Sequence, residues 1–189
     1  LLAGTLLGLI SGYYLGAIDM VISRFMDVLF AFPAILLALV LIAVLGQGID
    51  RVMIAIGLVY TPLFARVSRG SVLAERVKTY VEAARMTGAS NSAILRRHLL
   101  PNILAPLTVQ ASLCMSYAIL AEAALSFLGL GTQPPTPSWG IMLSKGRDLV
   151  NFSPWLSIWP GLAIMLTVFA FNVLGDGLRD ALDPWLKGE

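Results

Sequence analysis

The sequence has little of what catalytic and metal-binding proteins usually need. Cys114 is its only cysteine and His98 its only histidine, so it offers neither a disulfide framework nor a cluster of soft metal ligands. A phosphate-binding loop of the form G-x-x-x-x-G-K-[ST] does not occur, so the chain is not expected to bind and hydrolyse ATP itself. No nucleophile is evident near His98, so no Ser/His/Asp set can be proposed. We therefore predict no catalytic residues, no metal site and no cofactor.

Charge is also scarce. Charged residues make up 13% of the chain, against roughly 25% in soluble domains, whereas hydrophobic residues make up 58%. This composition indicates a protein of the lipid bilayer. Apolar segments recur throughout and no soluble block interrupts them, which predicts a single membrane domain over residues 1–189.

The positive charge is unevenly distributed. Seven basic residues fall within 32 positions, against two acidic ones: Arg66, Arg69, Arg76, Lys78, Arg85, Arg96 and Arg97 against Glu75 and Glu82. The positive-inside rule places this part of the chain in the cytoplasm. A nucleic-acid partner is not expected, because no nucleic-acid motif accompanies the basic residues.

Five apolar segments predict an all-α, polytopic transmembrane bundle. The expected spans are residues 1–17, 31–45, 51–68, 103–127 and 154–174. The chain begins at Leu1, already inside an apolar run, and we expect a sixth span upstream of it. Pro33 is expected in the first turn of the second span, and Pro62 is expected to kink the third.

The first span carries a glycine at every fourth position: Gly4, Gly8, Gly12 and Gly16. This spacing places the glycines along one stripe of a helix, where another helix backbone can pack closely. We interpret the stripe as structural.

A polar stretch, residues 79–102, separates the third span from the fourth. Thr79 followed by Glu82 forms a capping-box pattern that predicts a helix start. Gly88 can end that helix in the left-handed conformation, and Ser90 or Asn91 can cap a second helix. Pro101 is expected to end the second helix at Leu100.

The spacing of this stretch resembles the EAA loop of bacterial ABC importer permeases. The matching residues are Glu82-Ala83-Ala84, Gly88 and, after nine further residues, His98-Leu99-Leu100-Pro101. The resemblance implies a coupling helix that docks into a groove of a cytoplasmic ATP-binding subunit. The residues expected to form this docking and turn site are Glu82, Ala83, Ala84, Arg85, Gly88, Leu100 and Pro101. Without the full spacing, an ordinary helical hairpin capped by Glu82 would explain the same letters.

Two later stretches resemble the dipeptide, oligopeptide and nickel branch of these permeases. One is the predicted outer loop, residues 129–153, with LGLG, QPPTPSWG and GRD in and beside it; the other is the terminal LGDGLRDALDP at residues 174–184. The tryptophans at 139, 155 and 159 are typical of an interfacial aromatic belt. That role is compatible with a loop that faces a substrate-binding protein.

The resemblance covers essentially the whole chain and implies a permease subunit working by alternating access in the bacterial inner membrane. Its implied partners are a second, similar permease, two ATP-binding subunits, an extracytoplasmic solute-binding protein and the bilayer. Di- or oligopeptides are the expected cargo, with nickel or another small solute as the alternative. An ATP-independent channel or carrier, and a structural membrane subunit, are the competing classes.

Glu122 is the ionisable residue that stands out within the predicted spans. A charged group at membrane depth is costly to bury, so it is a candidate for the translocation path. The alternative is a position near the outer end of its helix, where it hydrogen-bonds to a neighbouring helix.

Overall fold

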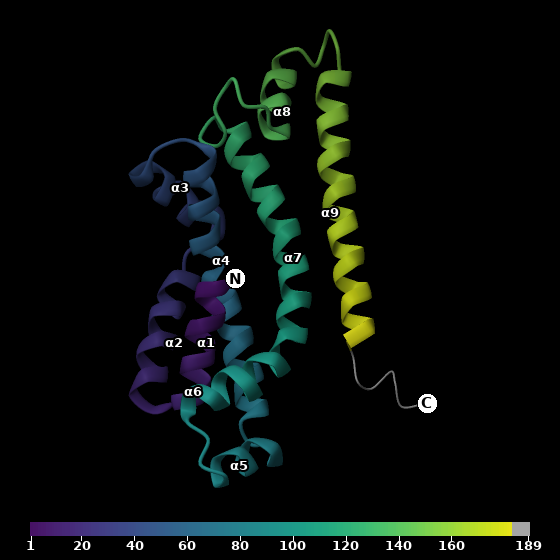
Figure 1. The fold of residues 1–189 in the computed structure, drawn as a ribbon. Coiled ribbons are helices and arrows are strands. Elements are labelled where there is room, and N and C mark those ends of the chain that lie inside the picture. The colour runs from purple at the N-terminus through teal and green to yellow at the C-terminus, as the bar shows by residue number, and fades with distance from the viewer. Residues whose placement is uncertain (183–189) are drawn as a thin grey trace. The chain divides into compact units, whose positions relative to one another are not determined.

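The computed structural model describes residues 1–182, and every regular element in that range is helical (Figure 1). The elements are α1 (Leu2–Tyr14), α2 (Gly16–Phe30), α3 (Ala34–Leu45), α4 (Ile49–Glu75), α5 (Thr79–Met86), α6 (Asn91–Ala93), the π-helical η1 (Ile94–Leu99), α7 (Leu100–Phe127), α8 (Trp139–Asp148) and α9 (Trp155–Leu182). The predicted all-α membrane fold is confirmed. The end of the terminal signature, Asp183-Pro184, lies outside the described residues.

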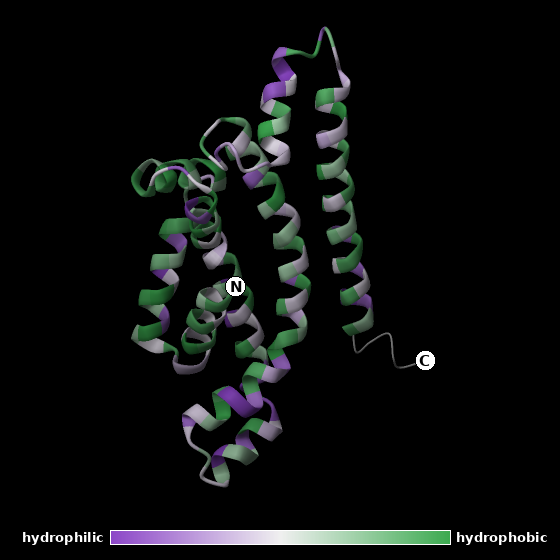
Figure 2. Cartoon of the chain, turned by 45° about the horizontal axis from the view of Figure 1, so that its top comes forward, coloured by the Kyte–Doolittle hydropathy of each residue, from purple (hydrophilic) through white to green (hydrophobic). Residues whose placement is uncertain are grey.

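Among residues 1–182, three helical runs are long and apolar enough to cross a bilayer: α4, the continuous run Asn91–Phe127, and α9. The pair α2 and α3 meets the same test jointly but is bent by 93°. The remaining apolar segment is the shorter helix α1. The five expected segments therefore appear as three long helices, one bent pair and one short helix. Figure 2 shows hydrophobic residues along most of α9 and hydrophilic ones gathered around α5 and η1.

The first predicted span does not run unbroken to residue 17. Leu15 and Gly16 both have left-handed backbones, with φ of 56° and 59°. They end α1 at Tyr14 and turn the chain into α2, so α1 and α2 lie side by side (purple in Figure 1). Gly16 is therefore a turn residue, because it supplies a conformation that costs glycine little.

The second predicted span begins later than expected. Pro33 is the N-cap of α3 and lies outside its first turn. The bend of 93° between α2 and α3 falls at residues 31–33. Proline disfavours a helical backbone at the residue before it, which explains why the helix breaks there.

The contacts group the chain into two compact units. The first unit contains residues 1–31, 60–111 and 175–182, and the second contains residues 32–59 and 112–174. Because α4, α7 and α9 each run from one unit into the other, the division does not follow a break in the chain. The assignment of residues 1–189 to a single domain stays a prediction.

The first unit is built on close packing of α1 against α4. A Cβ atom added at Gly12 would lie 2.9 Å from the carbonyl oxygen of Arg69, and one at Gly4 or Gly8 would overlap a carbonyl oxygen of α4. Ser68 Oγ donates to the carbonyl oxygen of Thr5 over 3.0 Å between the same helices. Three of the four stripe glycines therefore bring two backbones together, as the spacing predicted.

The second unit joins α7, α8 and α9. Ser116 Oγ donates to the carbonyl oxygen of Val168 (3.2 Å) and to Asn172 Oδ1 (3.1 Å) on α9. Added Cβ atoms at Gly140 and Gly146 of α8 would overlap Ala123 of α7 and crowd Leu156 of α9. Small residues thus allow α8 to pack against both neighbouring helices.

Candidate functional site

The helix α5 has one buried and one exposed face. Val81 and Ala84 are buried, whereas Glu82, Ala83 and Met86 are exposed, Met86 to 89%. Residues three apart share a face of a helix, so Ala83 and Met86 lie together on the outer side. The helix therefore presents a small apolar surface bordered by a carboxylate, and Met86 is a member that sequence reasoning missed.

The start of α5 differs from the predicted capping box. Lys78 is the N-cap, its backbone is extended, and no side chain caps the helix. Thr79 is already the first helical residue, so its hydroxyl is not in the position that a capping box requires. The carbonyl oxygen of Lys78 accepts instead from the amides of Val81 (2.9 Å) and Glu82 (3.3 Å). Glu82 is consequently an exposed surface residue of the first turn.

Gly88 ends α5 as predicted. Its φ is +79°, its N–H donates to the carbonyl oxygen of Arg85, and the N–H of Ala89 donates to that of Ala84, both over 3.0 Å. These two bonds form a Schellman motif, which satisfies carbonyl groups at the end of a helix. The motif fixes the direction in which the chain leaves α5.

The second helix of the segment starts as predicted but does not end at Leu100. Ser90 Oγ accepts from the amide of Ala93 over 3.3 Å and caps α6. The chain then passes through η1, in which Leu100 N–H donates to Leu95, and continues directly into α7. The expectation that Pro101 ends this helix is wrong. Proline has no N–H, so one α-helical hydrogen bond is missing at this position. The π-helical turn just before it uses the wider i→i+5 hydrogen-bond spacing, and the helix continues past the proline.

The 79–102 segment is attached to the end of α1 through Tyr13. Tyr13 Oη donates to Asn91 Oδ1 over 2.8 Å, and the guanidinium carbon of Arg85 lies 5.5 Å from the centre of the Tyr13 ring. Arg76 Nη1 donates to the carbonyl oxygens of Gly12 (3.2 Å) and Tyr13 (3.1 Å). Sequence reasoning missed Tyr13 and Arg76, because partners so far apart in the chain leave no local pattern.

A second attachment joins the segment to the end of α4. Glu75 Oε1 accepts from Lys78 Nζ over 2.6 Å, and its Oε2 accepts from Tyr80 Oη over 2.7 Å. Burial and then the hydrogen bond to the Glu75 carboxylate raise the pKa of Tyr80 to about 12. The turn between α4 and α5 is therefore held by a protonated phenol and an ion pair.

The basic residues after Gly88 face solvent. Arg96 and Arg97 are exposed and, with Ser90, Ser92 and Ala93, line an open hollow of about 440 Å³. Leu100 is half-buried and Pro101 exposed where η1 meets α7. The structure thus brings Glu82, Ala83, Arg85 and Gly88 together at one exposed helix, whereas Ala84 faces inward and Pro101 belongs to the next helix.

Comparison with known families decides which class of membrane protein this arrangement belongs to. The sequence profile of the family described as "Binding-protein-dependent transport system inner membrane component" matches residues 4–188. The chain belongs to this family.

Curated relatives of this inner-membrane component are permease proteins. The chain is 50% identical over 187 residues to the dipeptide transport system permease protein DppC of Alkalihalophilus pseudofirmus, covering 99% of this chain and 62% of that protein. It shows the same identity and coverage with the glutathione transport system permease protein GsiD of Pectobacterium atrosepticum. With GsiD of Escherichia coli O157:H7 it is 52% identical over 176 residues, covering 93% of this chain and 58% of that protein. The chain therefore spans about three-fifths of the length of these relatives.

Glu122 belongs to a hydrogen-bonded turn at the end of α7. Glu122 Oε1 accepts from Ser126 Oγ (2.6 Å) and from Thr132 Oγ1 (3.1 Å), and Ser126 Oγ accepts from the amide of Thr132 (3.0 Å). Glu122 also lines, with Trp139, an open pocket of about 360 Å³. These bonds join α7 to the loop that follows it, and a part in the translocation path stays a prediction.

Within residues 1–182, no group of three or more His, Cys, Asp or Glu side chains is placed to hold a metal ion. Cys114 is a buried free thiol. The candidate site is formed by the exposed helix α5, whose ends are held by backbone hydrogen bonds, and its docking role stays a prediction.

Proposed function

We propose that the chain is the membrane-spanning permease subunit of an ATP-driven importer of di- or oligopeptides. It would form half of a translocation path that works by alternating access, together with a second, homologous permease. Two ATP-binding subunits and an extracytoplasmic solute-binding protein complete the proposed complex. Membership of the binding-protein-dependent family supports the class of complex, and the names of the dipeptide and glutathione relatives support peptide cargo over nickel.

The observation that carries the proposal is the exposed face of α5. Glu82, Ala83 and Met86 project from a helix whose far end is fixed by Gly88 and whose inner face is buried. Small and apolar side chains allow another protein to approach closely, and a carboxylate at the edge can fix its orientation. We assign this face, with Arg85, to the groove of an ATP-binding subunit.

The attachments of the segment explain how docking would produce motion. A ligand shifts a conformational equilibrium only by its different affinities for the two states. ATP binding in the partner would therefore favour one position of α5, and the bonds through Tyr13 and Glu75 would carry that position to the ends of α1 and α4. ATP hydrolysis itself is assigned to the partner subunits.

The test is transport by the purified complex in proteoliposomes with the solute-binding protein and a panel of dipeptides, oligopeptides and nickel. We expect ATP-binding subunits to co-purify and peptide uptake to require ATP. Charge reversal in Glu82→Lys should release the ATP-binding subunits and abolish ATP-driven uptake. Asp50→Lys is the matched control, because Asp50 is also an exposed acid in the first turn of a helix, α4. Uptake that ignores ATP, with no ATP-binding subunit present, would favour the channel or carrier.

A further inference from the structure

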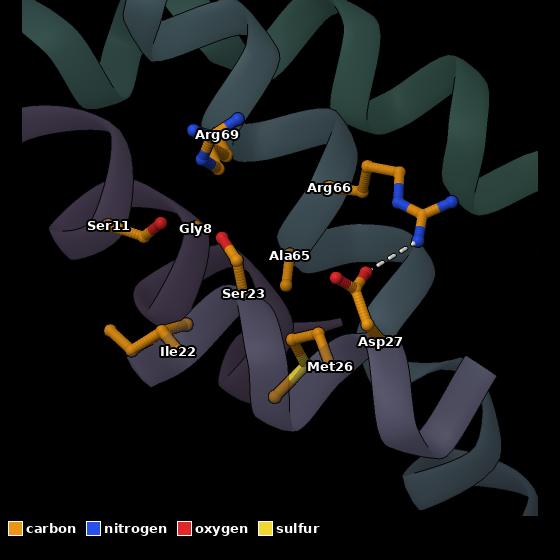
Figure 3. Close-up of a pocket in the computed structure, with 9 residues that line it drawn as sticks. All are labelled: Gly8, Ser11, Ile22, Ser23, Met26, Asp27, Ala65, Arg66 and Arg69. Carbon is orange, nitrogen blue, oxygen red and sulfur yellow. Dashed lines mark hydrogen bonds and ion pairs between the residues drawn. The ribbon is translucent and has the colours of Figure 1, made fainter. Parts of the chain in front are cut away.

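A cavity lies between α1, α2 and α4, entirely within the first unit. Its volume is about 320 Å³, and its wall combines charged, hydroxyl and apolar side chains (Figure 3). In this view Asp27 and Arg66 lie on the side of the cavity away from Ser11, and Met26 of α2 lies beside Asp27. Both signs of charge therefore border one cavity of a membrane-spanning unit.

The two ion pairs around this cavity differ in how many hydrogen bonds their side chains make. Arg69 binds Asp19 through two bonds, Nε to Oδ1 at 2.6 Å and Nη2 to Oδ2 at 2.7 Å, and Asp19 also accepts from Ser11 and Ser23. Arg66 and Asp27 share one contact of 3.2 Å, and both side chains are 58% exposed. The first pair is structural, whereas the second retains much of its hydrogen-bonding capacity, since a guanidinium offers five donors and a carboxylate about four acceptor sites.

The ring of Phe30 orients the guanidinium group of Arg66. Its guanidinium carbon lies 4.3 Å from the centre of the Phe30 ring, one helical turn beyond Asp27 on α2. Stacking on the ring holds the guanidinium plane while one edge reaches Asp27. An exposed single contact of this kind contributes little to stability, so the pair can open at small cost.

The position of this pair at the cavity wall gives it a functional meaning. Arg66 and Asp27 both line the hollow, and each side chain is more than half exposed. Ionisable side chains that line a cavity of a membrane protein are candidates for a solute site. The wall carries Asp27, Arg66 and Arg69, and Arg69 is paired with Asp19, so the remaining acid and base suit a ligand that itself carries both signs.

We propose that this cavity binds the two charged ends of a zwitterionic short peptide, with Asp27 receiving the ammonium group and Arg66 the carboxylate. The proposal rests on the proposed import of peptides and assigns a solute site to the chain. An anionic lipid headgroup is disfavoured, because Arg69 is already ion-paired with Asp19 and the remaining arginine lies beside the Asp27 carboxylate.

The test uses the complete purified complex in detergent, without the solute-binding protein, and three radiolabelled probes. These are alanylalanine, its N-acetyl derivative and its C-terminal amide. Equilibrium dialysis gives Kd of each probe for the wild type, Asp27→Asn and Arg66→Gln. ATP-driven uptake of alanylalanine, with the solute-binding protein added, is measured on the same preparations.

We expect either cap to weaken wild-type binding about tenfold or more, since each removes one charge-assisted hydrogen-bond partner. Asp27→Asn should abolish the effect of acetylation and keep that of amidation, and Arg66→Gln should do the reverse. A merely structural role would weaken all three probes alike in the variants.

Equal binding of the three probes to the wild type, or a uniform loss in both variants, would overturn the proposal. So would an Arg66→Gln complex that loses co-purifying anionic lipid but binds alanylalanine normally. A wild type that binds the probes without ATP-driven uptake would contradict the proposed function and leave the site standing. ATP-driven uptake of alanylalanine together with equal binding of the three probes would contradict the proposed site and leave the proposed function standing.

Discussion

The phenol of Tyr13 donates a hydrogen bond to Asn91 Oδ1 over 2.8 Å, joining residues 78 positions apart in the chain. Tyr13 is buried, and Arg85 of α5 lies over its ring. The last turn of α1 is thereby connected to both helices that flank Gly88. A displacement of α5 would therefore act on α1 as well as on α4, which Glu75 joins to Tyr80.

Tyr13→Phe should weaken the coupling between ATP hydrolysis and transport. The change removes the bond to Asn91 but keeps the ring under Arg85, and a typical hydrogen bond contributes about 1 kcal/mol. We expect the number of peptides imported per ATP hydrolysed to fall about fivefold while the ATP-binding subunits stay bound. Tyr14→Phe is the control, because Tyr14 is exposed. Equal coupling ratios in the two variants would show that the bond transmits nothing.

Aspartate substitutions at Ala83 and Ala84 should have different consequences. Ala83 is exposed and Ala84 buried, so Ala83→Asp places a charge in the proposed docking surface, whereas Ala84→Asp places one in the packed interior of the loop. We expect Ala83→Asp to release the ATP-binding subunits without changing hydrogen exchange of the α5 amides. Ala84→Asp should accelerate that exchange, because an unpaired buried charge is strongly destabilising. Normal docking by the Ala83 variant would place the interface elsewhere.

The effect of each substitution at Gly88 on the stability of α5 should depend on how well the new residue adopts the positive φ of this position. Gly88→Ala should destabilise the end of α5 by about 1 kcal/mol, since φ of +79° suits glycine, and Gly88→Asn should be milder. Gly88→Pro should be the most severe, because proline cannot adopt this φ and lacks the N–H that bonds Arg85. Hydrogen exchange of the α5 amides measures each effect. Gly70→Ala is the control, because Gly70 lies inside α4 with open space around its Cβ position.

The phenol of Tyr80 should titrate well above an unperturbed tyrosine. Its pKa is raised to about 12, against about 10 for an unperturbed tyrosine. Between pH 10 and 12 the unfolded segment loses this proton first, so the contribution of Tyr80 to stability is complete below pH 10 and falls as pH rises. Ultraviolet absorbance of tyrosinate, compared between the wild type and Tyr80→Phe, isolates the titration. A difference curve centred near pH 10 would contradict the buried hydrogen bond to Glu75.

Substitutions of Glu122 should separate its structural bonds from its charge. Glu122→Gln keeps an oxygen that accepts from Ser126 and Thr132, whereas Glu122→Ala leaves both hydroxyls without that acceptor. We expect Glu122→Ala to lower thermal stability by about 1–3 kcal/mol and Glu122→Gln to preserve it. If Glu122→Gln nonetheless transports peptides much more slowly than the wild type, the charge itself acts in the path.

The sequence by itself determined the helical membrane fold, because apolar segments must satisfy their backbone groups internally in a bilayer. Local patterns also determined the close approach at the glycine stripe and the helix end at Gly88, since both depend on residues within one or two turns. The same local reasoning misplaced the start of α5 and the helix end at Pro101. Lys78 takes the N-cap position without a side-chain cap in one case, and a π-helical turn accommodates the proline in the other.

Only the tertiary structure decided which polar residues act together. Tyr13 and Asn91, and Asp27 and Arg66, come from helices far apart in the chain, and their pairing depends on how the backbones pack. Glu122 stood out in the sequence as an ionisable group in a span and bonds Ser126 one turn further along its own helix, yet its bond to Thr132 depends on how the loop after α7 folds. Hydropathy and spacing fix where a helix forms, whereas contacts between distant side chains depend on the packing of whole helices.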